Sequence, residues 1–326
     1  MQKFNPRLLA FPGGRWLGWA IGLAIIVPMA WQHYQRSQPY NGFSLDRLSI
    51  PEEQLETGGP GRDDIPALTD PRTISPQLAD YLAPEAPVIG IAVNGESRAY
   101  PYAILNWHEI INDRLGGEAI VVSYCPLCGS GVAFEGALDG RRLLFGVSGL
   151  LYQENLLLYD RGTASLWSQM TGTAISGPML GRQLRQLPIE HVTWSQWQAS
   201  HPDTDVLSVG TGYRRDYQHD PYREYRIALA ARGVGDSRLP ANALVIGVQY
   251  KGVTKAYPFS VLAKTKPDGR FQDFLHDDWI EIAFDATTRS AAVQGSHGEP
   301  IPFILSYWFA WHAFNPDTLL HAADEI

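Results

Sequence analysis

The stretch VIGIAVNGESRAYPYAIL at residues 88–105 carries the pattern from which the rest of the fold can be worked out. Apolar and polar residues alternate on either side of Asn94-Gly95, which predicts a β-hairpin with a two-residue turn. Pro101 then suits the start of a short helix, because proline is well tolerated in the first helical turn. The stretch therefore predicts a strand–turn–strand–helix unit.

This unit occurs twice in the chain. The segment VIGVQYKGVTKAYPFSVL at 245–262 is identical to it at eight of eighteen positions. A second pair follows in the same order, because WSQWQASHPDT at 194–204 and WFAWHAFNPDT at 308–318 share both tryptophans and the Pro-Asp-Thr trio. Each member of this pair predicts a short helix with a tryptophan face. Ordered matches of this kind indicate an internal duplication. We therefore expect a β-rich α+β protein with two related halves.

The segments around the repeats set the expected domain boundaries. Residues 36–69 are polar and rich in proline and glycine, which predicts a spacer and an extended lead-in. We expect the first half at 70–210, a polar and aromatic connecting loop at 211–243, and the second half at 244–326. The first half is longer between its matched segments, and the added chain includes residues 143–169, which predict two or three strands.

The N-terminal part of the chain predicts a membrane anchor. Residues 16–35 carry no formal charge, and twenty helical residues span the roughly 30 Å core of a bilayer. Lys3, Arg7 and Arg15 precede this transmembrane segment without any acid, so residues 1–15 should remain in the cytoplasm. The body of a single-pass inner-membrane protein would then lie on the periplasmic or extracellular side. A cleaved signal peptide is the alternative, although the segment lacks a good cleavage site.

The charge distribution limits the partners that the exported body can bind. The formal net charge of the chain is −8, and residues 1–36 contribute +4, which leaves −12 on the remainder. An acidic body argues against binding to nucleic acid. The membrane, through the N-terminal helix, is the expected partner, and the sequence names no protein partner for redox chemistry or metal delivery.

Cys125 and Cys128 are the two cysteines of the chain, in the motif VVSYCPLCGSG. A β-run beginning near Ala119 leads into the motif, and Gly129 allows a sharp return, so both sulfurs can converge on one point. This geometry suits a thiophilic metal or a reversible disulfide. The residues that follow make a poor helix, which disfavours a thioredoxin-like fold. The alternative is an inert pair or a static local disulfide.

His108 is the expected third member of the site. It lies in NWHEIIND, in the helix that follows Pro101, and a Gly-Gly turn and one strand separate that helix from Cys125. An imidazole at this place would serve as a metal ligand or as a base for a thiol. The plainer interpretation is a helix histidine bonded to Asn112 or to a carbonyl. We expect the neighbouring Glu109 to be a surface charge.

Residues of the 143–169 insertion complete the candidate site. Tyr152, Asn155 and Trp167 belong to a polar and aromatic set that would line a ligand pocket above the cysteines. The alternative for the same residues is turn chemistry and core packing of the rings. Met170 would be a soft metal ligand, although a single methionine after a strand is typical of a core.

Several motifs, in order along the chain, resemble one family. DIPALTDP, AYPYAILNWHEIIND, YCPLCGSGVAF, FGVSGLLYQENLLLYDR and SLWSQ are together similar to the DUF3179 family of uncharacterised exported or membrane-anchored proteins. The resemblance is strong over residues 60–210 and weaker elsewhere, and it implies no defined activity. Glu154 departs from the family pattern, in which a small polar residue tends to stand beside the tyrosine.

These features give three functional hypotheses. The first is a membrane-anchored periplasmic site for a thiophilic metal or for redox chemistry, built on Cys125, Cys128 and His108. Copper(I) is the preferred metal, because soft thiolates suit it, and zinc is the second choice. The second hypothesis is a metal-free thiol–disulfide oxidoreductase. The third is a non-catalytic module that binds a ligand between the halves, so the sequence leaves open whether the protein is an enzyme.

The predicted topology can be tested with reporter fusions. A reporter joined after Ile326 should be active only if it functions outside the cytoplasm, because the basic residues before the anchor hold the N-terminus inside. The measurement compares a periplasm-dependent reporter with a cytoplasm-dependent one in the same position. Activity of the cytoplasm-dependent reporter would refute the topology.

Overall fold

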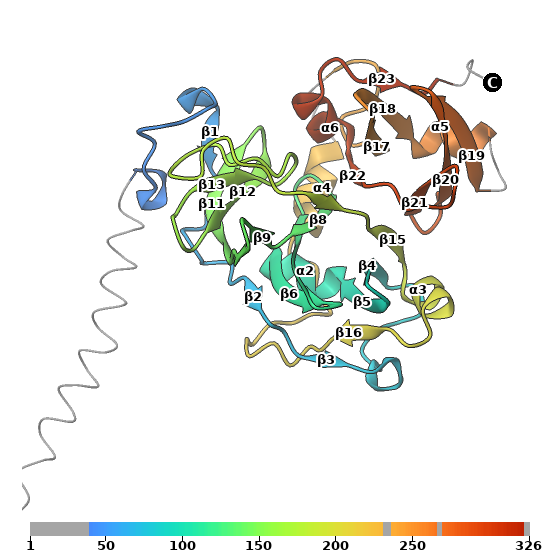
Figure 1. Cartoon of the computed structure of the whole chain (residues 1–326), viewed down its shortest axis with the longest axis horizontal. Coiled ribbons are helices and arrows are strands. Elements are labelled where there is room, and N and C mark those ends of the chain that lie inside the picture. The colour runs from blue at the N-terminus through green and yellow to red at the C-terminus, as the bar shows by residue number, and fades with distance from the viewer. Residues whose placement is uncertain (1–38, 231–235, 266–268, 323–326) are drawn as a thin grey trace, which may run out of the picture.

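The computed structural model describes residues 39–230, 236–265 and 269–322 (Figure 1). The expected cytoplasmic N-terminus at 1–15 and the expected anchor at 16–35 lie outside the described residues. Among those that are described, none of the helices has the length and apolar character needed to cross a bilayer.

The described chain is a β-rich α+β protein with several sheets and few helices, as the sequence predicts. Its α-helices are α2 (Tyr102–His108), α3 (Trp194–Ser200), α4 (Arg223–Ala230), α5 (Phe259–Thr265) and α6 (Trp308–Phe314). Three single-turn 3₁₀ helices lie in the lead-in and just after it, namely η1 (Pro39–Gly42), η2 (Glu52–Gln54) and η3 (Pro76–Leu78).

Two large sheets form the body of the molecule. The nine-stranded sheet has the order β2 (Leu68–Thr69), β6 (Ile110–Leu115), β7 (Glu118–Cys125), β8 (Ser130–Glu135), β22 (Phe303–Tyr307), β17 (Leu244–Tyr250), β18 (Val253–Pro258) and β23 (Leu319–Leu320), with β14 (Gln186–Leu187) also paired to β8. The eight-stranded sheet has the order β19 (Arg270–Leu275), β20 (Asp278–Asp285), β21 (Ser290–Gly295), β15 (Glu190–Thr193), β4 (Pro87–Val93), β5 (Glu96–Pro101), β16 (Asp205–Leu207) and β3 (Thr73–Ile74).

Two smaller sheets accompany them. One has the order β1 (Leu55–Thr57), β11 (Phe145–Tyr152), β12 (Asn155–Asp160) and β13 (Leu166–Ser168), and the other pairs β9 (Ala137–Leu138) with β10 (Arg141–Arg142). The three strands β11 to β13 confirm the prediction of two or three strands in the 143–169 insertion.

Each large sheet combines strands from both ends of the chain. The meander β6–β7–β8 joins the C-terminal strands β22, β17 and β18, and the meander β19–β20–β21 joins the earlier strands β15, β4 and β5. The two junctions are short, since Leu305 pairs with Gly131 in one and His191 with Ala291 in the other. The orange and red C-terminal strands are therefore continuous with the green and cyan ones (Figure 1).

Apolar clusters lie within the first part (residues 70–210), within the second part (residues 244–322) and also between the two. Ile89 on β4 belongs to a buried cluster of the first part, and Ile282 on β20 belongs to one of the second. A third cluster spans both parts, since it joins Val132 on β8 to Ile304 on β22 and Trp308 on α6. The parts are thus connected by shared apolar packing as well as by backbone pairing.

The local turns follow the sequence signals. Asn94 and Gly95 both have positive φ, 50° and 85°, which is the two-residue hairpin turn predicted between β4 and β5. Pro101 is the N-cap of α2. The capping box of α3, in which Thr193 and Gln196 exchange hydrogen bonds, fixes the start of the tryptophan-faced helix.

The lead-in and the connecting loop, both expected to be irregular, contain regular secondary structure. The lead-in at 36–69 contains β1 and β2, which pair with β11 and β6 and so attach it to the body. The connecting loop expected at 211–243 contains α4, which begins beside Asp220, whose carboxylate accepts a hydrogen bond from Tyr222 N at 3.0 Å. Proline and glycine content signals a break in regular structure, but it does not report strands that are completed by distant partners.

A close approach between a strand and a tryptophan ring recurs in the two parts. A Cβ atom on Gly90 would lie 2.2 Å from the Trp197 ring, and one on Gly247 would lie 2.2 Å from the Trp311 ring. The indole nitrogen of each tryptophan donates a hydrogen bond to a threonine hydroxyl. Trp197 donates to Thr204 at 2.8 Å, and Trp311 donates to Thr318 at 3.0 Å. The rings are therefore anchored and cannot retreat easily.

We predict that Gly90→Ala and Gly247→Ala each lower the free energy of unfolding by about 3 kcal/mol, because the added methyl group overpacks a fixed ring. Gly162→Ala is the matched control, since its Cβ would lie 3.6 Å from the nearest atom. Urea denaturation of the three variants provides the measurement. Equal midpoints for the three variants would show that the strand–ring approach carries no such constraint.

Candidate functional site

The two cysteines lie on the tight turn between β7 and β8. Cys125 ends β7 and pairs with Ser130, the first residue of β8. Gly129 has a φ of 63°, a left-handed conformation that glycine adopts without a side-chain penalty, so the predicted sharp return is confirmed. Both cysteines are free thiols with no exposed surface. The turn therefore presents two buried sulfurs three residues apart.

The sulfurs lie in a mixed apolar and polar environment. Both cysteines belong to a core cluster with Val121, Val132 and Trp308. The Cys128 thiol donates a hydrogen bond to the Glu154 carbonyl at 3.2 Å. Burial raises the pKa of Cys128 well above its ordinary value, and hydrogen bonding with the neighbouring Cys125 raises it further. The two thiols are thus adjacent, and the environment favours their protonated form.

Asn155 is placed beside the cysteines, as the sequence suggests. Its side chain is buried and opposes the rise in the Cys128 pKa through a hydrogen bond. Its amide nitrogen donates to Gln169 Oε1 at 2.9 Å, and Ser130 Oγ donates to the same oxygen at 2.9 Å. This buried network holds the amide against the dithiol turn.

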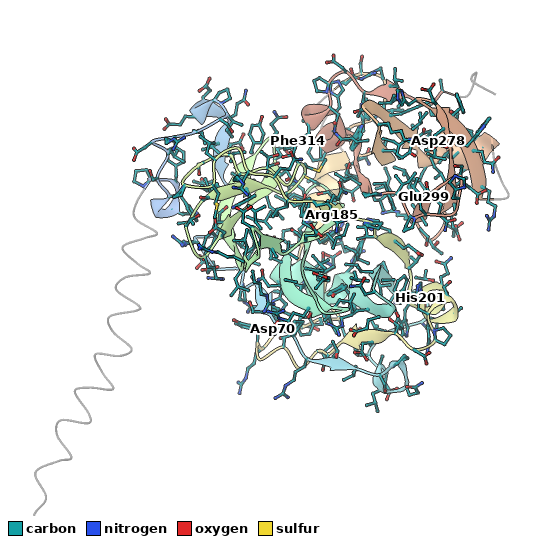
Figure 2. All side chains as sticks on the ribbon, in the orientation of Figure 1. Asp70, Arg185, His201, Asp278, Glu299 and Phe314 are labelled. Carbon is teal, nitrogen blue, oxygen red and sulfur yellow. The ribbon has the colours of Figure 1, made fainter. Side chains whose placement is uncertain are left out.

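Tyr152 and Trp167 lie elsewhere in the same region. The Tyr152 ring packs edge-on against Phe314 of α6, with 5.3 Å between the centroids. Phe314 is labelled in Figure 2. Trp167 is buried and donates from Nε1 to Asp160 Oδ2 at 3.1 Å. Met170 is buried in the cluster that contains the cysteines. Trp167 and Met170 thus take the core-packing role that the sequence left as the alternative.

In the structure, His108 forms hydrogen bonds with groups other than the cysteines. Its ring is fully buried, with Nδ1 2.7 Å from the Pro66 carbonyl and Nε2 2.8 Å from the Tyr217 hydroxyl. Its pKa is lowered, first by burial. Both ring nitrogens are therefore occupied, and the expectation that one of them reaches a sulfur is replaced by the plainer interpretation of a satisfied helix histidine. The partner is a carbonyl of the lead-in rather than Asn112.

The donor set does not fit a metal with three or four protein ligands. Among residues 39–230, 236–265 and 269–322, no three His, Cys, Asp or Glu side chains converge on one point. Structural zinc requires four ligands, so the cysteine pair with an engaged His108 does not provide a zinc site. Two sulfur donors remain for a metal of low coordination number.

The expectation that Glu109 is a surface charge is wrong. Glu109 is the C-cap of α2 with a φ of 56°, and only 6% of the residue is exposed. Tyr222 donates a hydrogen bond to Glu109 Oε1 at 2.8 Å. Burial raises the pKa of Glu109 to about 7, which the hydrogen bond from Tyr222 partly opposes. A buried carboxyl that titrates near neutrality can accept or donate a proton under ordinary conditions.

The Tyr222 hydroxyl contacts this carboxyl, and its pKa is also affected by the charge of Cys125. Burial raises the pKa of Tyr222, and the interaction with Glu109 and then with Cys125 adds to that rise. The same two cysteines contribute to the raised pKa of Tyr124. The hydroxyl of Tyr222 thus lies within the electrostatic environment of Cys125 and in direct contact with Glu109.

The end of α2 anchors the connecting segment over this region. Trp107 Nε1 donates to the His219 carbonyl at 3.2 Å, and His108 and Glu109 contact Tyr217 and Tyr222. One turn of α4 further along, the Tyr225 hydroxyl lies 3.4 Å from Glu154 Oε2. The segment that sequence analysis treats as a loop therefore covers the carboxyl and the dithiol.

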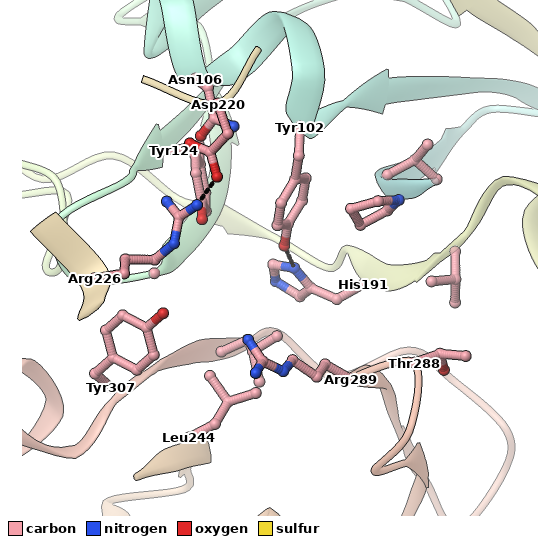
Figure 3. A pocket seen from close by; sticks show the side chains of 15 residues that line it. Tyr102, Asn106, Tyr124, His191, Asp220, Arg226, Leu244, Thr288, Arg289 and Tyr307 are labelled. Atoms are coloured by element: carbon pink, nitrogen blue, oxygen red, sulfur yellow. Dashed lines mark hydrogen bonds and ion pairs between the residues drawn. The ribbon is translucent and has the colours of Figure 1, made fainter. Parts of the chain in front are cut away.

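A pocket of about 240 Å³ lies between the two parts of the molecule (Figure 3). Its polar and aromatic lining consists of Tyr102, Asn106, Tyr124, Gly129, His191, Asp220, Arg226, Thr288, Arg289 and Tyr307. Neighbouring residues of a strand face opposite sides, so Tyr124 reaches this pocket whereas Cys125 points to the other face of β7. The dithiol turn nevertheless forms part of the wall through Gly129.

Sequence reasoning missed Glu109 and all the pocket residues except Gly129. One signal was available for Tyr102, because the first copy of the repeat has Ala-Tyr-Pro-Tyr where the second has Ala-Tyr-Pro-Phe. The extra hydroxyl binds His191 Nδ1 in the pocket. His191 shows no ligand spacing in the sequence, and only the pairing of β15 with β4 and β21 brings it there.

Glu109 makes the stability of the fold depend on pH. A carboxyl whose pKa rises from 4.5 to about 7 on folding contributes no penalty below pH 4.5. Its ionisation removes stability as the pH rises through about 7. We predict that Glu109→Gln raises the free energy of unfolding at pH 8 by up to about 3 kcal/mol relative to the unsubstituted protein, and leaves it unchanged at pH 4.

Chemical denaturation at both pH values measures this effect. Glu85→Gln is the control, because Glu85 is exposed. The same gain in both variants, or no gain in either, would contradict a titrating buried carboxyl at Glu109.

Comparison with known proteins places the chain in one family. No curated protein sequence and no solved structure matches it significantly. The family model described as a protein of unknown function, DUF3179, matches residues 62–297 and so covers the dithiol turn, α2, the connecting segment and most of the second part. The protein therefore belongs to the DUF3179 family.

Proposed function

We propose that this protein is a membrane-anchored, extracytoplasmic thiol–disulfide oxidoreductase whose reacting groups are Cys125 and Cys128. The observation that carries the proposal is the pair of free, buried thiols on one tight turn, with the buried Glu109 beside the strand that leads into it, since Tyr124 N donates to the Glu109 carbonyl at 2.9 Å. Burial raises the pKa of Glu109 to about 7. Perturbed titratable groups gathered at one place are typical of reaction sites.

The reaction is an exchange between the dithiol and a substrate disulfide. The Cys125 thiolate attacks one substrate sulfur, the substrate S–S bond breaks, and one substrate thiol leaves with a proton. The Cys128 thiolate then attacks Cys125 in the mixed disulfide, which releases the second substrate thiol. The substrate gains two electrons and two protons, and the protein loses the same number as Cys125 and Cys128 form a disulfide.

The surroundings support this order of attack. The Glu109 backbone lies beside β7, since its carbonyl accepts a hydrogen bond from Tyr124 N at 2.9 Å. In the proposed mechanism the Glu109 carboxylate, which Tyr222 contacts, is the acceptor of the proton from the Cys125 thiol. The Cys128 thiol is bonded to the Glu154 carbonyl and has a raised pKa, which suits a resolving thiol better than an attacking one. Both sulfurs are fully buried, so a substrate can reach them only if α4, with Tyr225 and the preceding Tyr222, moves aside.

A two-coordinate copper(I) site is the second candidate. It uses the same two sulfurs, which are adjacent and excluded from water in a cluster that also contains Met170. Thiolate and thioether sulfur suit copper(I), and no third protein ligand is required for it. In this case the protein would hold or transfer the metal rather than exchange disulfides.

We propose further that the halves arose by duplication and that residues 16–35 anchor the body on the exported side. Matching pairings support the duplication, since β4 and β5 pair Val88 with Pro101 as β17 and β18 pair Val245 with Pro258. The strand–ring approach of Gly90 to Trp197 also recurs in the second part. The uncharged 16–35 stretch and the basic residues before it support the anchor.

Thiol alkylation across a series of dithiol redox buffers tests the main proposal. We predict that the protein loses both alkylatable thiols together in oxidising buffers and regains them in reducing ones, as an internal disulfide requires. Cys125→Ser and Cys128→Ser should each abolish this transition. Glu109→Gln should slow reduction of a small neutral disulfide by about 10²-fold, because it removes the proton acceptor.

The controls separate the candidates. Glu85→Gln should leave the exchange rate unchanged. Thiols that stay alkylatable in the most oxidising buffer would refute the oxidoreductase. Copper that is retained by the anaerobically purified, reduced protein and lost from Cys125→Ser would then favour the metal site. If neither a disulfide transition nor retained copper is found, the remaining hypothesis is ligand binding between the halves.

A further inference from the structure

The pocket between the two parts has a charge opposite to that of the protein as a whole. Three of its lining residues are charged, Asp220, Arg226 and Arg289, and the first two form an ion pair (Figure 3). Burial lowers the pKa of His191 to about 3, so its ring is neutral and adds no charge. The pocket therefore carries one surplus positive charge in a chain of net charge −8.

The surplus charge belongs to Arg289, whose backbone has an unfavourable left-handed conformation. Its φ is 58°, a region in which a residue with a Cβ atom costs roughly 1–2 kcal/mol. It belongs to the turn from Asp285 to Ser290 between β20 and β21, whose ends pair as Cys125 and Ser130 do in the dithiol turn. The dithiol turn has Gly129 at the corresponding place, with a φ of 63°. A turn that glycine would fit without strain holds an arginine instead, and both residues line the pocket.

The rest of the lining offers hydrogen bonds and apolar surface. The rings of Tyr102 and Tyr124 pack together in a tilted arrangement with their centroids 4.5 Å apart, and the Tyr102 hydroxyl is hydrogen-bonded to His191. Asn106 Oδ1 is buried and has no hydrogen-bond partner among the described residues. Val88, Leu244 and Leu305 add aliphatic surface to the same cavity. A buried amide without a partner is costly unless a ligand or water satisfies it.

We propose that this pocket binds a small organic carboxylate with an apolar body. The carboxylate pairs with Arg289 at the mouth, where Arg226 provides a second guanidinium, and the apolar body lies against the tyrosine rings and the aliphatic residues. Arginine favours carboxylates because its planar donors match the two oxygens. The cavity of about 240 Å³ accommodates a molecule of the size of benzoate. This site is distinct from the dithiol, and it does not depend on the proposed redox function.

Isothermal titration calorimetry of the full-length protein with benzoate tests the site, and benzamide serves as the neutral isostere. We expect benzoate to bind and to raise the melting temperature in a concentration-dependent way, whereas benzamide should bind at least tenfold more weakly because it lacks the charge. Arg289→Gln should weaken benzoate binding by about tenfold or more and leave benzamide binding unchanged.

Arg141→Gln is the matched control, because Arg141 is exposed on β10 and does not line the pocket. It should bind benzoate as the unsubstituted protein does. The melting temperature of each variant without ligand shows that it is folded. Equal affinity for benzoate and benzamide, or unchanged benzoate binding in Arg289→Gln, would overturn the proposal. Equally tight binding of inorganic phosphate would also overturn it, since the apolar body would then contribute nothing.

Discussion

The hydrogen bond from Tyr307 N to the Cys128 carbonyl, 2.8 Å long, connects the dithiol turn to the C-terminal part of the chain. It continues the pairing of β22 with β8, in which Leu305 opposes Gly131. This junction, its counterpart between β15 and β21, and the apolar cluster that both parts share together set how the parts meet. The cysteines and Tyr307 belong to that shared cluster, so their positions depend on the backbone contact and on the packing around it.

The end of α2 has a second organising role. Its last residues and its C-cap hold the connecting segment through a tryptophan nitrogen, a histidine ring and a carboxyl. His108 is thus important for where the segment lies rather than for ligation. α4 extends from this anchorage, with Tyr222 and Tyr225 near the dithiol and Arg226 in the pocket. One helix therefore supplies a residue to each place, Tyr225 near the dithiol and Arg226 in the pocket.

Burial affects the titratable groups differently beside the dithiol and in the pocket. Beside the sulfurs it raises the pKa of Glu109 into the neutral range and disfavours the Cys128 thiolate, so proton transfer and thiol chemistry are linked. In the pocket it keeps His191 neutral, and since Asp220 pairs with Arg226, the surplus positive charge is that of Arg289. The same low-dielectric interior thus creates a proton-exchanging group on one face of β7 and an anion-selective cavity on the other.

The local structural units follow from the sequence alone. Alternation around Asn94-Gly95, the proline before α2, the strands of the 143–169 insertion and the turn at Gly129 were all predictable, because each depends on neighbouring residues and on backbone preferences. It also identified the family and the cysteine pair.

Which side chains meet depends on the tertiary fold. The short path along the chain suggests that His108 reaches the cysteines, but the lead-in and the connecting segment, distant in sequence, supply its partners. The sequence alone suggests a surface charge at Glu109, but Tyr222 of the connecting segment covers it. The pocket joins β15, α2 and the turn before β21 across the two sheets. Such contacts depend on long-range pairing, which periodicity and spacing along one segment do not encode.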